Sequence, residues 1–377
     1  MKIIVCPDSF KGSLSANEAA DIIADSIASL IPDAQIIKIP LGDGGEGTSS
    51  ILKENLKMEI QFCQAHDAMM NPVETKYLID KSKKIAFIES AEVIGLEKIN
   101  IENRNPMLAS SYGLGEVITD AIKMGCTDIS VSLGGSATCD GGMGMLNALG
   151  YRFFDKESNI LKGNGEETGY INRIEASERE SILSKIKFTA VCDVTNPLYG
   201  KSGAAYVYAP QKGANPIQVE ILDEGLKNLY DKSVDYKLVA EGSADFTGSG
   251  AAGGLGFALM TYLKASYKSG IDFCLEKLNF EEKISDADLI ITGEGRLDGQ
   301  SLMGKVLNGV LKQAGKYNIP LIAVGGSCKD YDLLKAAGVK EIFSISNKTL
   351  SLVENMQPEI AAQNLKNTIK KYFHIYL

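Results

Sequence analysis

Residues 3–30 of the chain are IIVCPDSFKGSLSANEAADIIADSIASL, and their pattern indicates the fold class. A short apolar run, Ile3–Cys6, predicts a strand, and a polar turn leads from it to a helix expected at about 15–30. Ser15 and Glu18 stand three residues apart at the start of the helical pattern, which is the signature of a capping box. A strand that enters a helix through a short turn is the building unit of a parallel sheet covered by helices.

Other segments repeat this order of strand, turn and helix, which predicts a doubly wound α/β domain with a parallel sheet. Their expected strands are Ile36–Ile39, Leu289–Ile291, Leu321–Val324 and Glu341–Ile345, and their expected helices cover about 45–55, 304–315, 330–336 and 357–372. Between them, residues 60–88 alternate apolar and polar in the manner of antiparallel hairpins. We therefore predict one domain formed by residues 1–60 and 285–377, with an inserted mixed α/β domain at 61–284.

Composition excludes several classes of protein. The 377 residues carry a net charge of −9, and an acidic chain is poorly suited to general nucleic-acid binding, which depends on neutralising phosphates. The apolar runs are too short for a membrane span, and the first residues lack the apolar core of a secretory signal. The 7 cysteines form no C-x-x-C pair and stand beside only 2 histidines, which argues against zinc and fits reduced thiols. We expect a cytoplasmic protein with no nucleic-acid or membrane partner.

Two polar segments follow the first two expected strands, and ligands of open α/β sheets bind at the carboxyl ends of strands. Asp8, Ser9 and Lys11 follow the first strand. Asp8 and Ser9 are residue types that turns commonly contain, whereas a turn does not explain Lys11. The ammonium group of Lys11 suits a phosphate or carboxylate ligand. Asp43 lies in GDGGEGT (residues 42–48), where glycines allow close approach to a ligand, and it is a candidate for Mg²⁺ or for accepting a hydroxyl proton. An ordinary turn with a capping acid is the alternative for both segments.

A third segment, IITGEGRLDGQSLMGK at residues 290–305, follows the expected strand Leu289–Ile291. Its charged residues are Glu294, Arg296, Asp298 and Lys305. The stretch Gly299–Lys305 fits G-x-x-x-x-G-K, but Val306 stands where a P-loop needs Ser or Thr, and the strand is expected to end well before the first glycine of that stretch. We reject the P-loop, and a charged ligand site or a solvated turn remains.

The inserted domain holds three further candidates. GGSATCDGG (residues 134–142) follows an expected strand at 129–133 and is expected to open a helix, so that its N–H groups form a phosphate cradle; the candidates are Gly134, Gly135, Ser136, Ala137 and Thr138. GSGAAGGLG (residues 248–256) fits G-x-G-x-x-G without a preceding strand, which argues against NAD and favours phosphate contact or tight packing by Gly250, Gly253 and Gly254. Asp193 closes an apolar strand at 188–192, where a carboxylate is costly unless it is paired or functional. It is a candidate metal ligand or general base, and a structural acid is the alternative.

Together these motifs resemble the bacterial glycerate kinase family of type I, the glycerate 2-kinase-like group. The matching segments, in order, are PDSFKGS (7–13), DGGEGT (43–48), GGSAT (134–138), Asp193 with NPL (196–198), PQKG (210–213), GAAGGLG (250–256) and TGEGRLD (292–298). The resemblance covers about residues 1–350. Two positions depart from it: Cys139 stands where Asn is usual, and Met303 stands where a His commonly precedes Gly-Lys.

The resemblance implies a flavodoxin-like domain with an inserted α/β domain, and it implies ATP and D-glycerate as substrates. The product is 2-phosphoglycerate, which we favour, or 3-phosphoglycerate, and Mg²⁺ is the expected cofactor. The alternatives are a kinase of another small hydroxy acid and a non-catalytic regulator that binds the same ligands. A homodimer is left open beside a monomer.

Phosphoryl transfer needs positioning and charge neutralisation, which gives each candidate a hypothetical role. Nucleotide phosphates are expected on Gly134–Thr138 and on Gly250, Gly253 and Gly254, with Mg²⁺ on Asp193 or Glu294. The expected substrate contacts are Asp8, Ser9, Lys11, Asp43, Arg296 and Asp298. The expected catalytic residues are Asp193, Asp43, Lys11 and Arg296, and either Asp43 or Asp193 takes the hydroxyl proton.

Overall fold

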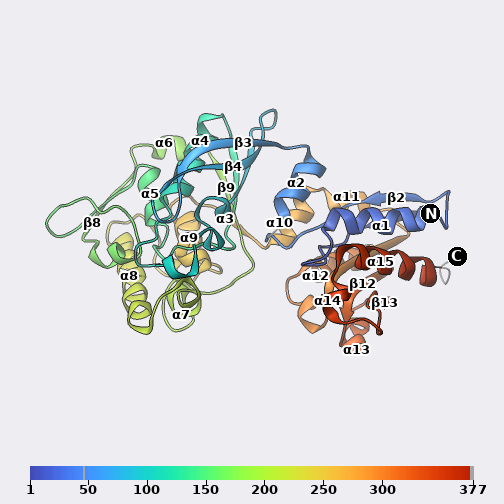
Figure 1. Cartoon of the computed structure of the whole chain (residues 1–377). Coiled ribbons are helices and arrows are strands. Elements are labelled where there is room, and N and C mark those ends of the chain that lie inside the picture. The colour runs from blue at the N-terminus through green and yellow to red at the C-terminus, as the bar shows by residue number, and fades with distance from the viewer. Residues whose placement is uncertain (46, 374–377) are drawn as a thin grey trace. The chain divides into compact units, whose positions relative to one another are not determined.

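The computed structural model describes residues 1–45 and 47–373, and the chain divides into two compact units. Unit 1 comprises Met1–Lys57 and Ser269–Leu377, and unit 2 is the intervening stretch Met58–Lys268 (Figure 1). The second boundary falls at Ser269 and not at residue 285 as predicted. The difference arises because the helices that follow Ser269 pack in unit 1, where α10 (Gly270–Lys277) contacts α12 (Val306–Lys316).

Unit 1 is built on a parallel sheet. Its strands are β1 (Lys2–Val5), β2 (Gln35–Lys38), β11 (Leu289–Leu297), β12 (Leu321–Cys328) and β13 (Glu341–Ser344). They lie in the order β13-β12-β11-β1-β2, and every pair is parallel. Numbered along unit 1, this order is 2-1-3-4-5, a doubly wound arrangement whose switch point lies between the first and third strands. Ligands of such sheets bind beyond the carboxyl ends of the strands at that point, here β1 and β11.

Helices cover this sheet. They are α1 (Ala16–Ala28), α2 (Thr48–Leu56), α10, α11 (Phe280–Ile284), α12, α13 (Tyr331–Ala336), α14 (Leu352–Asn355) and α15 (Pro358–Tyr372). The predicted capping box is confirmed, since Ser15 Oγ accepts the Glu18 N–H and the Glu18 carboxylate accepts the Ser15 N–H. α1 and α15 lie side by side (Figure 1) and form one apolar core with β1, β11 and β12.

β11 is longer than predicted. The sequence suggested a strand ending at Ile291, but pairing with β12 continues through Glu294 and Arg296 to Leu297. Glycine made this segment look like a turn, whereas here glycine permits close backbone contact: a Cβ on Gly293 would lie 2.5 Å from the carbonyl oxygen of Val324. Glu294 and Arg296 therefore stand on the end of a strand and not in a loop, while Asp298 and Lys305 follow it.

Unit 2 contains a mixed sheet. Its strands are β3 (Glu59–His66), β4 (Pro72–Asp80), β5 (Ile85–Glu89), β6 (Asp128–Ser132), β9 (Lys187–Val191) and β10 (Ser266–Lys268), in the order β10-β9-β6-β5-β4-β3. The β3–β4 and β4–β5 pairs are antiparallel, which confirms the hairpins expected at 60–88, and the other pairs are parallel. β7 (Arg152–Phe154) and β8 (Arg173–Glu175) form a separate antiparallel ribbon.

The helices of unit 2 complete its core. They are α3 (Ser90–Ile94), α4 (Tyr112–Lys123), α5 (Met143–Ala148), α6 (Glu180–Leu183), α7 (Ala204–Tyr208), α8 (Pro216–Asp235) and α9 (Ala251–Thr261). The longest of them, α8, was not predicted, although Asn215 and Gln218 form a capping box at its start. α5 begins at Met143 with Gly142 at its N-cap, which confirms the prediction that the segment 134–142 leads into a helix.

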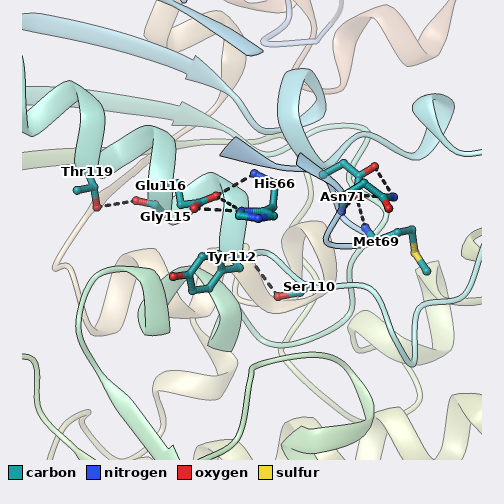
Figure 2. Close-up of polar contacts among 9 residues, drawn as sticks. His66, Met69, Asn71, Ser110, Tyr112, Gly115, Glu116 and Thr119 are labelled. Atoms are coloured by element: carbon teal, nitrogen blue, oxygen red, sulfur yellow. Dashed lines mark hydrogen bonds and ion pairs between the residues drawn. The ribbon is translucent and has the colours of Figure 1, made fainter. Parts of the chain in front are cut away.

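The start of α4 ties an edge strand to a buried turn. The Glu116 carboxylate accepts the backbone N–H of His66 at 2.8 Å and lies 3.0 Å from its Nδ1 (Figure 2). Gly113 leaves the room for this contact, because a Cβ there would lie 1.8 Å from the carbonyl oxygen of His66. On the other side, the N–H and Oγ of Ser111 both donate to the buried carboxylate of Asp140. The start of α4 thereby anchors the turn that leads into α5.

Candidate active site

A cavity of about 370 Å³ lies in unit 1, beyond the carboxyl ends of its strands. Its charged lining residues are Asp8, Lys11, Asp43, Glu294, Arg296 and Lys305. Ser9 also lines it, so the structure brings together the predicted residues that follow β1, β2 and β11. Asp298 is not among the lining residues. The remaining predicted residues, Asp193 and the two glycine-rich segments, belong to unit 2.

Backbone pairing that continues past the strands fixes where the three acids stand. The N–H of Asp8 donates to the carbonyl of Gly293 at 2.7 Å, and the N–H of Leu41 donates to the carbonyl of Pro7 at 2.9 Å. The segment containing Asp43 is supported from behind by Gly270 at the start of α10, where a Cβ would lie 1.9 Å from the carbonyl oxygen of Asp43. Neighbouring strand ends thus deliver Asp8, Asp43 and Glu294 to one cavity.

Asp8 is the most perturbed acid of the cavity. Its side chain is buried, and its Oδ1 accepts the N–H of Ser9 at 2.6 Å. Burial, and then the charge of Asp43, raise the pKa of Asp8 to about 7. Lys11 offsets part of this effect and donates to Asp43 Oδ2 at 3.2 Å. A carboxyl group with a pKa near neutrality can both hold and accept a proton at the working pH.

Glu294 supplies a buried carboxylate with an unsatisfied atom. Its side chain is 7% exposed, and within residues 1–45 and 47–373 its Oε1 atom has no hydrogen-bond donor. Burial raises the pKa of Glu294, while a hydrogen bond from Ser301 and the charge of Lys305 lower it. A buried oxygen without a donor is costly, so this atom suits a ligand proton or a cation.

Arg296 and Asp298 form a fixed pair at the end of β11. The Nε of Arg296 lies 2.6 Å from Asp298 Oδ2, and the exposed side chain of Arg296 also lines the cavity. Asp298 Oδ1 accepts the N–H of Gln300 and thereby caps a short 3₁₀ helix, Gly299–Leu302. Asp298 therefore holds Arg296 and the following turn, and this role explains a buried carboxylate outside the lining of the cavity.

In unit 2, the segment 134–138 combines open and buried positions. Gly134 and Gly135 are exposed, and a Cβ on Gly134 would meet no atom within 4 Å. Ser136, Ala137 and Thr138 are buried. The first two residues are therefore accessible to a ligand, and the last three are held by the protein.

The glycines of the second segment are explained by packing. Gly250, Gly253 and Gly254 are buried, and a Cβ on Gly253 would lie 2.0 Å from the carbonyl oxygen of Thr138. A Cβ on Gly250 would lie 2.2 Å from the carbonyl oxygen of Pro197. Of the two alternatives that the sequence left open, tight packing accounts for these residues, and the segment supports 134–138 from behind.

Asp193 lies two residues beyond the end of β9 and is exposed. Its carboxylate therefore bears no burial cost, contrary to the prediction, and the functional hypothesis for Asp193 rests on its accessibility. The following turn is anchored, since Asn196 donates to the carbonyl of Ser202 and accepts from the hydroxyl of Tyr208.

The two departures from the family pattern differ in environment. Cys139 is buried in the core of unit 2, and burial raises the pKa of its thiol to about 12, so it packs as an inert residue. Met303 is 79% exposed.

In the described ranges, no cluster of three or more His, Cys, Asp or Glu side chains could hold a metal ion. No helix there is long and apolar enough to cross a membrane.

Comparisons with known proteins agree with one another. The model of the glycerate kinase family matches residues 3–377. A glycerate kinase of Bacillus cereus is 39% identical over 371 residues, which cover 98% of this chain and 96% of the relative. A glycerate 2-kinase of Escherichia coli K12 is 40% identical over 350 residues, covering 92% and 90%. The crystal structure of a Salmonella typhimurium LT2 protein assigned as glycerate kinase 2 matches with a TM-score of 0.88 at 37% identity, covering 100% of this chain and 98% of that one.

Proposed function

The chain belongs to the glycerate kinase family, and from that premise we propose that it transfers the γ-phosphate of ATP to D-glycerate and yields 2-phosphoglycerate. The observation that carries this proposal is the cavity of unit 1, where three cationic and three acidic side chains meet. The relative named glycerate 2-kinase supports the 2-isomer over 3-phosphoglycerate. The strand order of unit 1 likewise supports a flavodoxin-like domain that carries unit 2 as an insertion.

The cavity offers a partner for each polar group of glycerate. Lys11, Arg296 and Lys305 are cations that suit the carboxylate or the transferring phosphoryl group, and the planar guanidinium can bind either in a bidentate manner. The hydroxyl that attacks phosphorus loses its proton to a carboxylate. Asp43 and Asp193 remain candidates for that base, and the raised pKa of Asp8 adds a third.

The nucleotide phosphates are assigned to the 134–138 segment of unit 2. The exposed Gly134 and Gly135 allow close approach of phosphate oxygens to the backbone. Gly250, Gly253 and Gly254 serve this segment through packing and are not assigned to direct phosphate contact.

Mg²⁺ fits the donors that the cavity presents. The Oε1 atom of Glu294 is buried and lacks a donor in the described part of the chain, and a carboxylate oxygen is the hard ligand that Mg²⁺ prefers. Glu294 would hold the ion, with Asp193 as the alternative. When bound, Mg²⁺ neutralises phosphate charge during transfer.

A coupled assay of ADP release tests the proposal with glycerate, tartronate and glycolate as acceptors. We expect turnover with D-glycerate, and we expect phosphorus NMR to identify 2-phosphoglycerate as the product. Faster turnover of tartronate or glycolate would assign the enzyme to another hydroxy acid. Tight binding of ATP and glycerate without product would favour a regulator.

A further inference from the structure

Lys212 is a buried cation to which the mechanism above gives no role. It ends a 3₁₀ turn, Pro210–Lys212, in the PQKG motif, and it is 3% exposed. Its Nζ donates to the carbonyl of Thr138 at 2.7 Å and to the hydroxyl of Ser136 at 3.2 Å. Lysine is almost never buried without partners, and the partners here are two residues of the 134–138 segment.

The same segment is held by other parts of unit 2. The carbonyl of Gly135 accepts the N–H of Leu96 at 2.8 Å, and the carbonyl of Gly134 accepts the hydroxyl of Ser90 at 3.3 Å. With Thr138 bound by Lys212, three carbonyl oxygens of the segment are engaged by protein donors. In contrast, the Oγ1 atom of Thr138 is buried and has no partner among the described residues. A fixed segment with engaged carbonyls and an unsatisfied hydroxyl suits an anion that accepts hydrogen bonds.

The charge of Lys212 is not cancelled by a direct ion pair within residues 1–45 and 47–373. The titratable groups whose charge acts on it are Cys139 and Asp140. The carboxylate of Asp140 accepts hydrogen bonds from Ser111 and from the backbone of Gly142 and Gly144, and it makes no contact with Lys212. A neutral donor would make the same two hydrogen bonds without burying a charge, so the ammonium group needs a further reason.

We propose that Lys212 is a positioning residue for the nucleotide: it fixes Ser136 and Thr138 from behind and supplies positive charge beneath the 134–138 segment, where a phosphate binds. The inference rests on the proposed function, because that function assigns the phosphates of ATP to this segment. Lys212 itself is too deeply buried to be a catalytic residue. It acts through the residues that it holds.

This role makes nucleotide affinity depend on pH. Burial lowers the pKa of Lys212 to about 8. Below that pH the side chain is charged and attracts phosphate, and above it the side chain becomes neutral and the attraction is lost. An anion on the segment favours the charged form, so ADP binding near pH 8.5 should take up a proton.

Calorimetric titration of the full chain with ADP tests this directly between pH 6.5 and 9.5. We expect the Kd of the wild type to rise about tenfold over this range, in keeping with the loss of one positive charge beneath the bound phosphate. Lys212→Met should bind about tenfold more weakly at pH 7, with a Kd independent of pH and no proton uptake in buffers of different ionisation enthalpy. Lys212→Arg, which keeps its charge throughout, should also lose the pH dependence.

Lys227→Met is the matched control, since Lys227 is an exposed lysine of α8, and it should behave like the wild type. If Lys212→Met fails to fold, as judged by thermal melting, the wild-type pH profile and Lys212→Arg decide the matter. An ADP affinity of Lys212→Met equal to that of the wild type, or the same pH profile in both, overturns the inference while glycerate turnover stands. ADP binding with the expected profile but no phosphoglycerate overturns the proposed function alone.

Discussion

Asp8 shows how a single residue of the cavity opposes folding. Its pKa of about 7 in the folded chain lies above the usual value of 3.8, so the folded state holds the proton more tightly than the unfolded state. The stabilising contribution of this proton is complete below about pH 4 and is lost as the pH rises through 7. At neutral and higher pH, a buried charge therefore remains as a cost to stability.

Replacing Asp8 should raise the stability of the protein and lower its activity. We expect the free energy of unfolding of Asp8→Asn to exceed that of the wild type by about 2–4 kcal/mol at pH 8, and by less at pH 5. Its turnover of glycerate should fall, because a cavity acid is lost. Urea unfolding at both pH values measures the effect, with Asp33→Asn at an exposed site as the control. A gain of equal size at both pH values would contradict the assigned titration.

Replacing Asp193 should lower activity without changing stability. The side chain is exposed, so Asp193→Asn should leave the melting temperature within about 1 °C of the wild type, as is usual for surface substitutions. If Asp193 is the general base or holds Mg²⁺, kcat should fall by about 100-fold or more. Steady-state kinetics beside thermal melting separates the two effects. Normal turnover would remove Asp193 from the catalytic set and leave Asp43 and Asp8 as the candidates for the base.

At the scale of elements, the glycine-rich segments of unit 2 separate into two physical kinds. Gly253 has a φ of +70°, and a Cβ there would lie 2.0 Å from the carbonyl oxygen of Thr138. Gly134 is not in the left-handed region, and a Cβ there meets open space. Packing within the fold therefore requires glycine at position 253. Packing does not require it at position 134, where close approach of a ligand would explain it.

Two alanine substitutions test this distinction. We expect Gly253→Ala to lose about 3 kcal/mol or more of stability, because backbone strain and a steric clash act together. Gly134→Ala should melt like the wild type and should raise the KM for ATP with little effect on the KM for glycerate. Thermal melting and steady-state kinetics of both variants provide the comparison. A stable Gly253→Ala variant would mean that the backbone of α9 can move away from Thr138.

Sequence patterns predicted elements best where a single local signal was decisive. The strands of unit 1 and its helices α1, α2, α12, α13 and α15 followed from short apolar runs and from the Ser15–Glu18 capping box, whereas α10, α11 and α14 were not predicted. β11 was cut short because glycine in a turn and glycine in a closely packed strand look alike in a sequence. The helix α8 was missed although its capping box was present.

The candidate site was predicted where residues follow strands, since parallel strands bring their carboxyl ends together. Asp8, Lys11 and Arg296 were identified in this way and line one cavity. The position of Lys212 could not be derived, because its contact with Ser136 joins residues 76 positions apart in the chain. The exposure of Asp193 could not be derived from the sequence either, since the residue after a strand can face the core or the solvent.

At the scale of the whole molecule, the two units reach their folds by different routes. In unit 1, β1 pairs with β11, so Ile3 and Leu289 are neighbours in the sheet although all of unit 2 lies between them in the sequence. Closing so long a loop is entropically costly and tends to slow folding. Unit 2 is continuous in sequence, and its apolar core consists of residues between Ala65 and Ala265. Unit 2 therefore carries its own core within one uninterrupted stretch of chain.

This difference predicts how fragments behave. We expect residues 58–268 expressed alone to fold and to unfold in a single cooperative transition, because the mixed sheet and its core are complete within them. Residues 1–57 alone should remain unfolded, since β1 lacks its partner β11. Circular dichroism during thermal melting measures both fragments against the full chain. If residues 58–268 melt without cooperativity and expose apolar surface to a hydrophobic dye, the core of unit 2 depends on the rest of the chain, and the two units are one folding unit.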